Sequence, residues 1–129
     1  MISFDSPKFK DPSVFQSEAM RIYDVCQGCR RCFNVCPSFD VLFRGIDEQD
    51  GEVNKVSPAV LDRVVDLCYY CKLCFNHCPY CPPHAYDLDF PRLMLWGKHL
   101  KSLRVKPRLR DRLLADVDLM GRLLGWIAP

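Results

Sequence analysis

Two segments of the chain carry apolar residues at helical spacing and begin with similar pairs of residues. The first begins at Asp11-Pro12 and the second at Ser57-Pro58, in each case an N-cap residue followed by a proline at the first helical position. Each apolar stripe ends on a cysteine; the stripes are Phe15, Ala19, Ile22 and Cys26, then Leu61, Val64, Val65 and Cys68. The pattern predicts two helices that each lead into a cysteine-rich segment.

The segments after these helices contain shorter apolar runs and turn residues. Residues 39–43 are apolar and predict a helical turn, whereas the acidic residues 45–54 contain Gly51 and predict a surface loop. Three prolines within residues 79–83 predict an extended bend, because proline cannot continue a helix.

Two more helices are predicted in the C-terminal part, over residues 93–103 and 109–127, with a break before Pro107. The second has a stripe made of Leu113, Val117, Met120, Leu124 and Ile127. No convincing alternating strand pattern is longer than a few residues. We therefore expect an all-α fold.

Composition narrows the class of protein. The chain has 129 residues, enough for one domain, and nine cysteines, which predict disulfides, bound metal or clusters. The N-terminus MISFDSPKFKDPS has no basic segment followed by an apolar one, and no run approaches about 18 apolar residues. We expect a cytoplasmic protein without a transmembrane span, and an odd cysteine count in a reducing compartment argues against disulfides.

Charge is uneven along the chain. Residues 1–91 hold 9 Lys/Arg and 13 Asp/Glu, a net charge of −4, whereas residues 92–129 hold 9 and 3, a net of +6. We expect residues 1–91 to form the core and residues 92–129 to form a basic, amphipathic helical tail that docks on a partner.

A cysteine motif occurs twice. Residues 26–37 read CQGCRRCFNVCP and residues 68–79 read CYYCKLCFNHCP, so both follow Cys-x2-Cys-x2-Cys-x3-Cys-Pro. In iron–sulfur proteins with this spacing, three thiolates bind one cubane and the fourth binds the other cluster. The sequence thus predicts two clusters: Cys26, Cys29, Cys32 and Cys78 bind cluster one, and Cys68, Cys71, Cys74 and Cys36 bind cluster two.

Other readings of these residues remain open. Four-cysteine zinc is the alternative, and the protein would then be a structural or interaction module with a basic binding tail, although zinc does not explain the third Cys-x2-Cys step. His77 and His84 are not needed as ligands, because cysteines fill all eight places, and Cys81 is expected to be a buried free thiol, with an alternative ligand or a redox-active thiol as the other readings.

Side chains within the motifs are candidates for tuning the clusters. Arg30, Arg31 and Lys72 are placed to offset cluster charge, or else are solvated. Apolar side chains are expected to shield the clusters from water, or to pack in the core; they are Phe33, Phe75, Leu73, Tyr69 and Tyr70.

The paired motifs and the tail CPYCPPHAYDLDFPRLML carry a family resemblance over roughly residues 10–105. The sequence resembles the helical two-cluster ferredoxin domain of heterodisulfide-reductase iron–sulfur subunits and of the iron–sulfur subunit of anaerobic glycerol-3-phosphate dehydrogenase. The resemblance implies an α-helical ferredoxin fold, as in the C-terminal half of the succinate dehydrogenase iron–sulfur subunit, with two [4Fe-4S] clusters that relay electrons.

Longer relatives continue into a catalytic region with CCG motifs, which this sequence lacks. Either the catalytic part is a separate subunit, or this sequence is a fragment or split product. We expect a non-catalytic electron-transfer component of an oxidoreductase, because the sequence shows no nucleophile–base constellation and cysteines fill every cluster ligand place; its redox partner is expected to be a flavoprotein or a CCG-type catalytic subunit.

The basic stretch Arg92–Arg112 contains eight Lys/Arg and a single acid, Asp111. Trp96 is its one aromatic residue, which makes a stacking platform for nucleic acid bases poor. We expect the tail to bind a partner protein and no nucleic acid, with membrane-surface association as the alternative.

Overall fold

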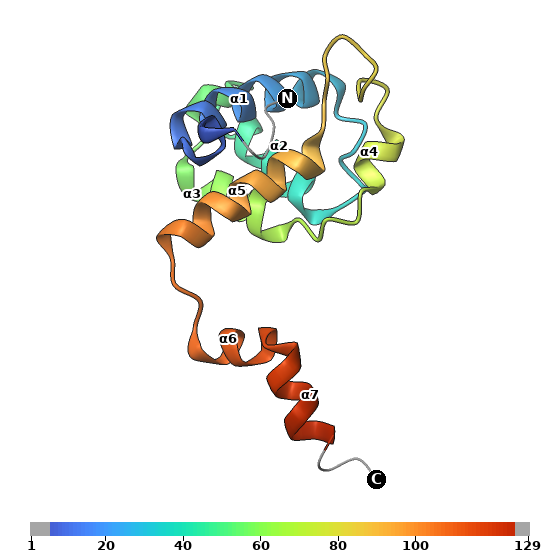
Figure 1. Cartoon of the computed structure of the whole chain (residues 1–129). Coiled ribbons are helices and arrows are strands. Elements are labelled where there is room, and N and C mark those ends of the chain that lie inside the picture. The colour runs from blue at the N-terminus through green and yellow to red at the C-terminus, as the bar shows by residue number, and fades with distance from the viewer. Residues whose placement is uncertain (1–5, 126–129) are drawn as a thin grey trace.

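The computed structural model describes residues 6–125, and every regular element within this range is a helix. The elements in chain order are η1 (Pro7–Lys10), α1 (Pro12–Cys29), α2 (Pro37–Asp47), η2 (Val53–Lys55), α3 (Pro58–Leu67), α4 (Leu73–His77), α5 (Phe90–Arg104), α6 (Leu109–Ala115) and α7 (Val117–Gly125). Helices α1 to α5 lie together, and α6 and α7 extend away from them (Figure 1). The predicted all-α fold is confirmed.

Side-chain caps start the two helices that lead to the motifs. Asp11 Oδ1 accepts a hydrogen bond from the Ser13 N–H at 2.8 Å, and Ser57 Oγ accepts one from the Val60 N–H at 3.4 Å. A proline follows each cap, where its missing N–H costs nothing. Both predicted helix starts are therefore confirmed.

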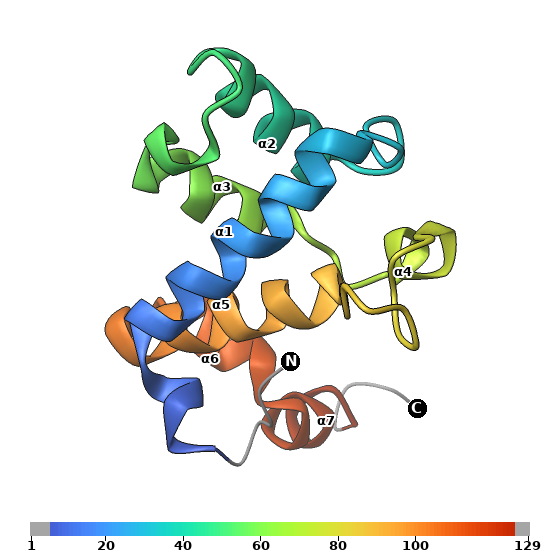
Figure 2. The ribbon, with the colours of Figure 1, turned by 90° about the horizontal axis from the view of Figure 1, so that it is seen from above.

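The core lies between α1, α2, α3 and α5. Figure 2 shows α1 passing over α5, and these two helices are in contact. The indole Nε1 of Trp96 donates a hydrogen bond to the Phe9 carbonyl at 2.5 Å, and the two rings stack with centroids 5.0 Å apart. The largest fully buried side chains are Trp96, Tyr23, Phe39, Phe43, Ile22 and Leu42.

Helices α2 and α3 form the most extensive helix pair. They approach closely at Gly45, where an added Cβ would lie 2.6 Å from Val60 Cγ1. The predicted loop over residues 45–54 was therefore wrong at its start: residues 45–47 belong to α2, and Gly45 and Ile46 are buried. Ile46 continues the apolar face of α2, which keeps the helix on the core until the turn at Gly51, with φ 86°.

Helix α5 belongs to the packed body. The expected boundary after residue 91 falls inside this helix, and buried residues follow it: Leu93, Met94, Trp96, Gly97 and Leu100. The predicted helix over residues 93–103 is confirmed, and the body extends to Arg104.

The predicted single helix over residues 109–127 is wrong, because α6 and α7 are separate and Ile127 lies outside the described residues. The break is at Asp116, whose Oδ1 accepts a hydrogen bond from the Leu119 N–H at 3.0 Å, so a capping side chain starts a new helix. Neither α6 nor α7 has a buried residue. Among residues 6–125, no helix has the length and apolar character needed to cross a membrane.

Substitution of Gly97 tests how closely α5 packs against α1 and α3. A Cβ at this position would lie 2.8 Å from Val65 Cγ2 and 3.1 Å from Phe15 Cζ. We expect Gly97→Ala to lower the free energy of unfolding by about 1–3 kcal/mol through overpacking, as measured by chemical denaturation. The matched control is Gly121→Ala in α7, where nothing lies within 4 Å of the added methyl group. Equal stability of the two variants would contradict this packing.

Candidate functional site

The first motif begins on the last turn of α1. Cys26 and Cys29 lie within this helix, which ends where Arg30 adopts a left-handed conformation with φ 49°. The Arg30 N–H bonds the Cys26 carbonyl at 2.8 Å, and the chain then turns toward Cys32. The helix therefore fixes two thiols and the turn places the third.

The second motif begins where α3 ends, so unlike the first motif it does not start inside a helix. Cys68 caps the C-terminus of α3, and Cys74 is buried within α4. On either side of Cys71, Tyr70 and Lys72 have φ values of 57° and 61°. Left-handed non-glycine residues cost about 1–3 kcal/mol each and gather at functional sites, so these turns mark the cysteine loops as specialised backbone.

Each fourth cysteine stands at a helix end. Cys36 is the N-cap of α2, with extended backbone and no side-chain capping bond, and Cys78 follows the last residue of α4. The Cys78 Sγ instead accepts a hydrogen bond from the Tyr80 N–H at 3.4 Å. Both side chains are thus available to a site outside their own helices.

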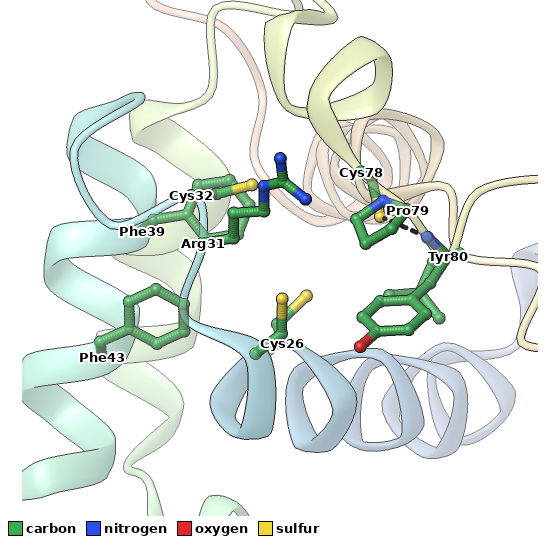
Figure 3. A pocket seen from close by; sticks show the side chains of 10 residues that line it. Cys26, Arg31, Cys32, Phe39, Phe43, Cys78, Pro79 and Tyr80 are labelled. Atoms are coloured by element: carbon green, nitrogen blue, oxygen red, sulfur yellow. Dashed lines mark hydrogen bonds between the residues drawn. The ribbon is translucent and has the colours of Figure 1, made fainter.

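A small cavity of about 20 Å³ brings the two motifs together. Figure 3 shows the thiols of Cys26, Cys32 and Cys78 on three sides of it. Its lining consists of Cys26, Cys29, Arg31, Cys32, Phe39, Phe43, Cys78, Pro79, Tyr80 and Leu88. The thiol of Cys78 therefore reaches the first motif, although 46 residues separate it from Cys32 along the chain.

A second cavity of about 20 Å³ shares part of this lining. It is bounded by Cys26, Cys32, Phe39, Cys74, Phe75, Cys78, Leu88 and Phe90. Cys74 is the cysteine that this cavity adds to the set, so a thiol of the second motif lies next to thiols of the first. Apart from Phe75, the aromatic and leucine side chains of these walls lie outside the set expected from the sequence.

The remaining thiols form another set around the second motif. Charge on Cys36 and Cys71 contributes to raising the pKa of both Cys68 and Cys74, which places these four side chains within electrostatic reach of one another. Cys36 therefore lies within electrostatic reach of two cysteines of the other motif as well as of Cys32 in its own. Cys71 is the exposed member of the set, and Cys68 and Cys74 are buried.

Burial keeps the free thiols protonated. It raises the pKa of Cys32 to about 11 and that of Cys74 to about 12, and it also raises the pKa of Cys26, Cys68 and Cys78. At each of these five cysteines, negative charge on a neighbouring thiolate raises the pKa further. Because a metal ligand must be the thiolate, binding at this site releases protons, and binding energy must supply that deprotonation.

Positive groups lie close to the thiols. Arg31 lines the first cavity and donates from Nε to His77 Nε2 at 3.2 Å. Lys98, on α5, donates from Nζ to the Cys68 carbonyl, and its charge lowers the pKa of Cys68 against the effect of burial. Lys98 was missed by sequence reasoning, because nothing in its local pattern links it to the motif.

Two of the expected charge partners have other contacts. Arg30 Nη1 bonds Asp47 Oδ2 at 3.0 Å, and Lys72 Nζ lies 5.3 Å from the centre of the Tyr70 ring. The arginine charge is therefore matched by a carboxylate. Arg31 is the basic residue of the motifs that lines the cavity.

The expected aromatic shield is only partly in place. Phe75 lines the second cavity, and Phe33 stacks on Phe43 with centroids 6.1 Å apart. Tyr69 and Leu73, however, are 80% and 57% exposed, so they cover no buried surface within residues 6–125. The walls are made instead by side chains that pack from other helices.

The two histidines and the ninth cysteine near the motifs each form a hydrogen bond with another group of the chain. The Nδ1 of His84 accepts from the Tyr86 N–H at 3.1 Å, and the Nε2 of His77 accepts from Arg31. The Sγ of Cys81 donates to the Cys78 carbonyl at 3.2 Å and is half-buried. Cys81 was expected to be a buried thiol and is only half-buried, and the ligand assignments of all three residues stay predictions.

The donor set suits a sulfur-ligated group of some size. A single zinc ion bound by four thiolates needs its sulfur atoms only about 3.8 Å apart, given Zn–S bonds of about 2.3 Å. Within the described part of the chain, no three Cys, His, Asp or Glu side chains converge in a way that would hold one ion. The thiols stand instead around small apolar cavities, and these sulfur donors fit an iron–sulfur cluster in their chemistry.

Comparison with known proteins identifies the domain. Searches among curated proteins and among solved structures found no match. Residues 19–99, more than half of the chain, match the family described as the citrate utilization protein B Fer4-like domain. This range includes both cysteine motifs and most of α5. The chain therefore belongs to this family and is a ferredoxin-like iron–sulfur domain.

Proposed function

We propose that the protein transfers single electrons through two [4Fe-4S] clusters, as the iron–sulfur subunit or domain of a heterodisulfide-reductase-like or flavin-linked oxidoreductase complex. Cluster one is held by Cys26, Cys29, Cys32 and Cys78. Cluster two is held by Cys68, Cys71, Cys74 and Cys36. The chain itself provides no catalytic residue in this proposal.

One observation carries the proposal above the others. The thiol of Cys78 shares a cavity with the three cysteines of the first motif, as the cross-ligation of two-cluster ferredoxins requires. The reciprocal approach of Cys36 to Cys68 and Cys74 supports the same pattern at the second motif. Neither motif can complete a cluster alone under this scheme.

A cubane cluster accepts and releases one electron without forming or breaking a bond to the protein. The chain's residues hold it and set its surroundings. Phe39, Leu88 and Phe90 exclude water from the cavities, and Arg31 and Lys98 place positive charge near the thiolates. Because Cys74 of the second set lines a cavity together with Cys26 and Cys32 of the first, an electron has a short distance to travel between the two clusters.

The partners are assigned from charge and exposure. Residues 105–129, which follow α5, hold five Lys/Arg and three Asp/Glu, a net charge of +2, and α6 and α7 have no buried residue. We assign this tail to docking on a redox protein with an acidic rim and an apolar groove, a flavoprotein or a CCG-type subunit in the cytoplasm. The family name refers to citrate utilization, so small organic acids are the first substrates to test with such an assembly.

Metal analysis tests the cluster content. The protein purified without oxygen is expected to contain about eight iron and eight sulfide per chain, because eight cysteines fill the ligand places of two cubanes. Electron paramagnetic resonance after dithionite reduction should show the broadened signal of two interacting clusters. Stoichiometric zinc without sulfide would instead make the protein a structural zinc module with a basic binding tail.

A pair of cysteine variants tests the cross-ligation. Cys78→Ala should lose the signal of cluster one, because the variant removes a ligand from the cavity shared with Cys26 and Cys32. The matched control is Cys81→Ala, three residues away, whose thiol bonds only a carbonyl within the described contacts. It should keep both clusters. Identical spectra for Cys78→Ala and wild type would rule out this ligand assignment.

Truncation tests the role of the tail. A chain ending at residue 106 keeps α5 and should retain its iron and sulfide, since α6 and α7 bury nothing on the body. We expect it to lose the redox protein that copurifies with the full chain and is identified as a flavoprotein or CCG-type subunit by mass spectrometry. Copurification of that same protein with the truncated chain would exclude docking through the tail.

A further inference from the structure

Ser38 is a fully buried residue whose hydroxyl has no hydrogen-bond partner. Its exposed fraction is 0%, and it is the buried polar side chain of the described core. A buried hydroxyl without a partner costs about 1–3 kcal/mol, so such groups in native proteins have a reason to be present. The hydroxyl therefore calls for an acceptor within the site that it adjoins.

The helix itself offers Ser38 no acceptor. In the middle or at the end of a helix, a serine bonds the carbonyl three residues back: Ser17 Oγ donates to the Val14 carbonyl at 3.1 Å, and Ser102 Oγ donates to the His99 carbonyl at 2.7 Å. Ser38 lies in the first turn of α2, so its equivalent carbonyl precedes the helix, before the N-cap Cys36. The acceptor must come from another part of the structure.

The position of Ser38 points to the second cysteine set. It lies in the first turn of α2, and Gly45 near the other end of this helix faces Val60 near the start of α3, so the two helices run in opposite directions. Helix α2 also pairs with α3, which leads directly into Cys68. The hydroxyl is thus buried at the end of the helix pair where the thiols proposed for cluster two gather.

We propose that the Ser38 hydroxyl donates a hydrogen bond to a bridging sulfide of cluster two, an acceptor that no thiol of the chain supplies, and thereby raises the reduction potential of this cluster. The inference rests on the proposed function. A donor stabilises the reduced form more than the oxidised form, because reduction adds negative charge to the sulfur atoms. The hydroxyl keeps its proton in both states, and one electron alone is exchanged.

A redox titration followed by electron paramagnetic resonance tests the proposal on the cluster-loaded protein. Ser38→Ala is expected to shift the midpoint potential of cluster two downward by about 59 mV, which is a tenfold change in the ratio of oxidised to reduced form for one electron. Cluster one should keep its potential. Cluster two is assigned as the one whose spectrum changes in Cys36→Ser.

Two control variants separate the hydroxyl from general packing. Ser102→Ala removes a hydroxyl that bonds the His99 carbonyl and should leave both potentials unchanged. Ser38→Thr keeps a hydroxyl at the site and should retain the wild-type potential of cluster two. If the alanine variant does not hold cluster two, the threonine variant decides the question: a wild-type potential supports the proposal and a lowered one overturns it.

The outcomes distinguish the two proposals. Unchanged potentials in Ser38→Ala with full iron and sulfide content would overturn the role of Ser38 and leave the proposed function intact. A shift confined to cluster one would also overturn it. Lack of iron and sulfide in the wild-type protein would overturn both.

Discussion

The approach of Cys78 to Cys26 and Cys32 is the contact on which the arrangement of the site depends. It joins the end of α4 to the end of α1 across a cavity with largely apolar walls. Helix α4 also contacts α5 and accepts a hydrogen bond from Arg31 at His77, but it is five residues long and has one buried residue, Cys74. A helix this short has no stability of its own, so what binds the thiols also decides where this part of the chain lies.

Much of the helical framework could be predicted from local signals. Asp11-Pro12 and Ser57-Pro58 set helix starts through capping bonds that involve only neighbouring residues. The end of α2 could not be predicted, because Gly45 and Ile46 read as the start of a loop until Val60 packs against them. The break at Asp116 had a local signal, a capping side chain, which the long apolar stripe concealed.

The candidate site likewise combines features that could be predicted from the sequence with features that could not. The eight motif cysteines are evident from spacing alone, because residues close together in the sequence define the ligand pattern. The residues around them come from distant segments: Phe39 comes from α2, Phe90 from the start of α5, and Lys98 from the middle of α5. Tertiary packing brings these residues together, and no hydrophobic periodicity in the sequence predicts that packing. Ser38 belongs to this group, since its significance is visible only from its burial.

The distance along the chain between the first motif and Cys78 has a consequence for biosynthesis. Cys78 is made 46 residues after Cys32, a delay of about 2–9 s at a translation rate of about 5–20 residues per second. During this interval, the nascent chain exposes three thiols that lack their fourth partner. Under the proposed ligand scheme, metal loading must follow translation of the second motif, and a ribosome that stalls between the motifs would release a chain unable to complete either centre.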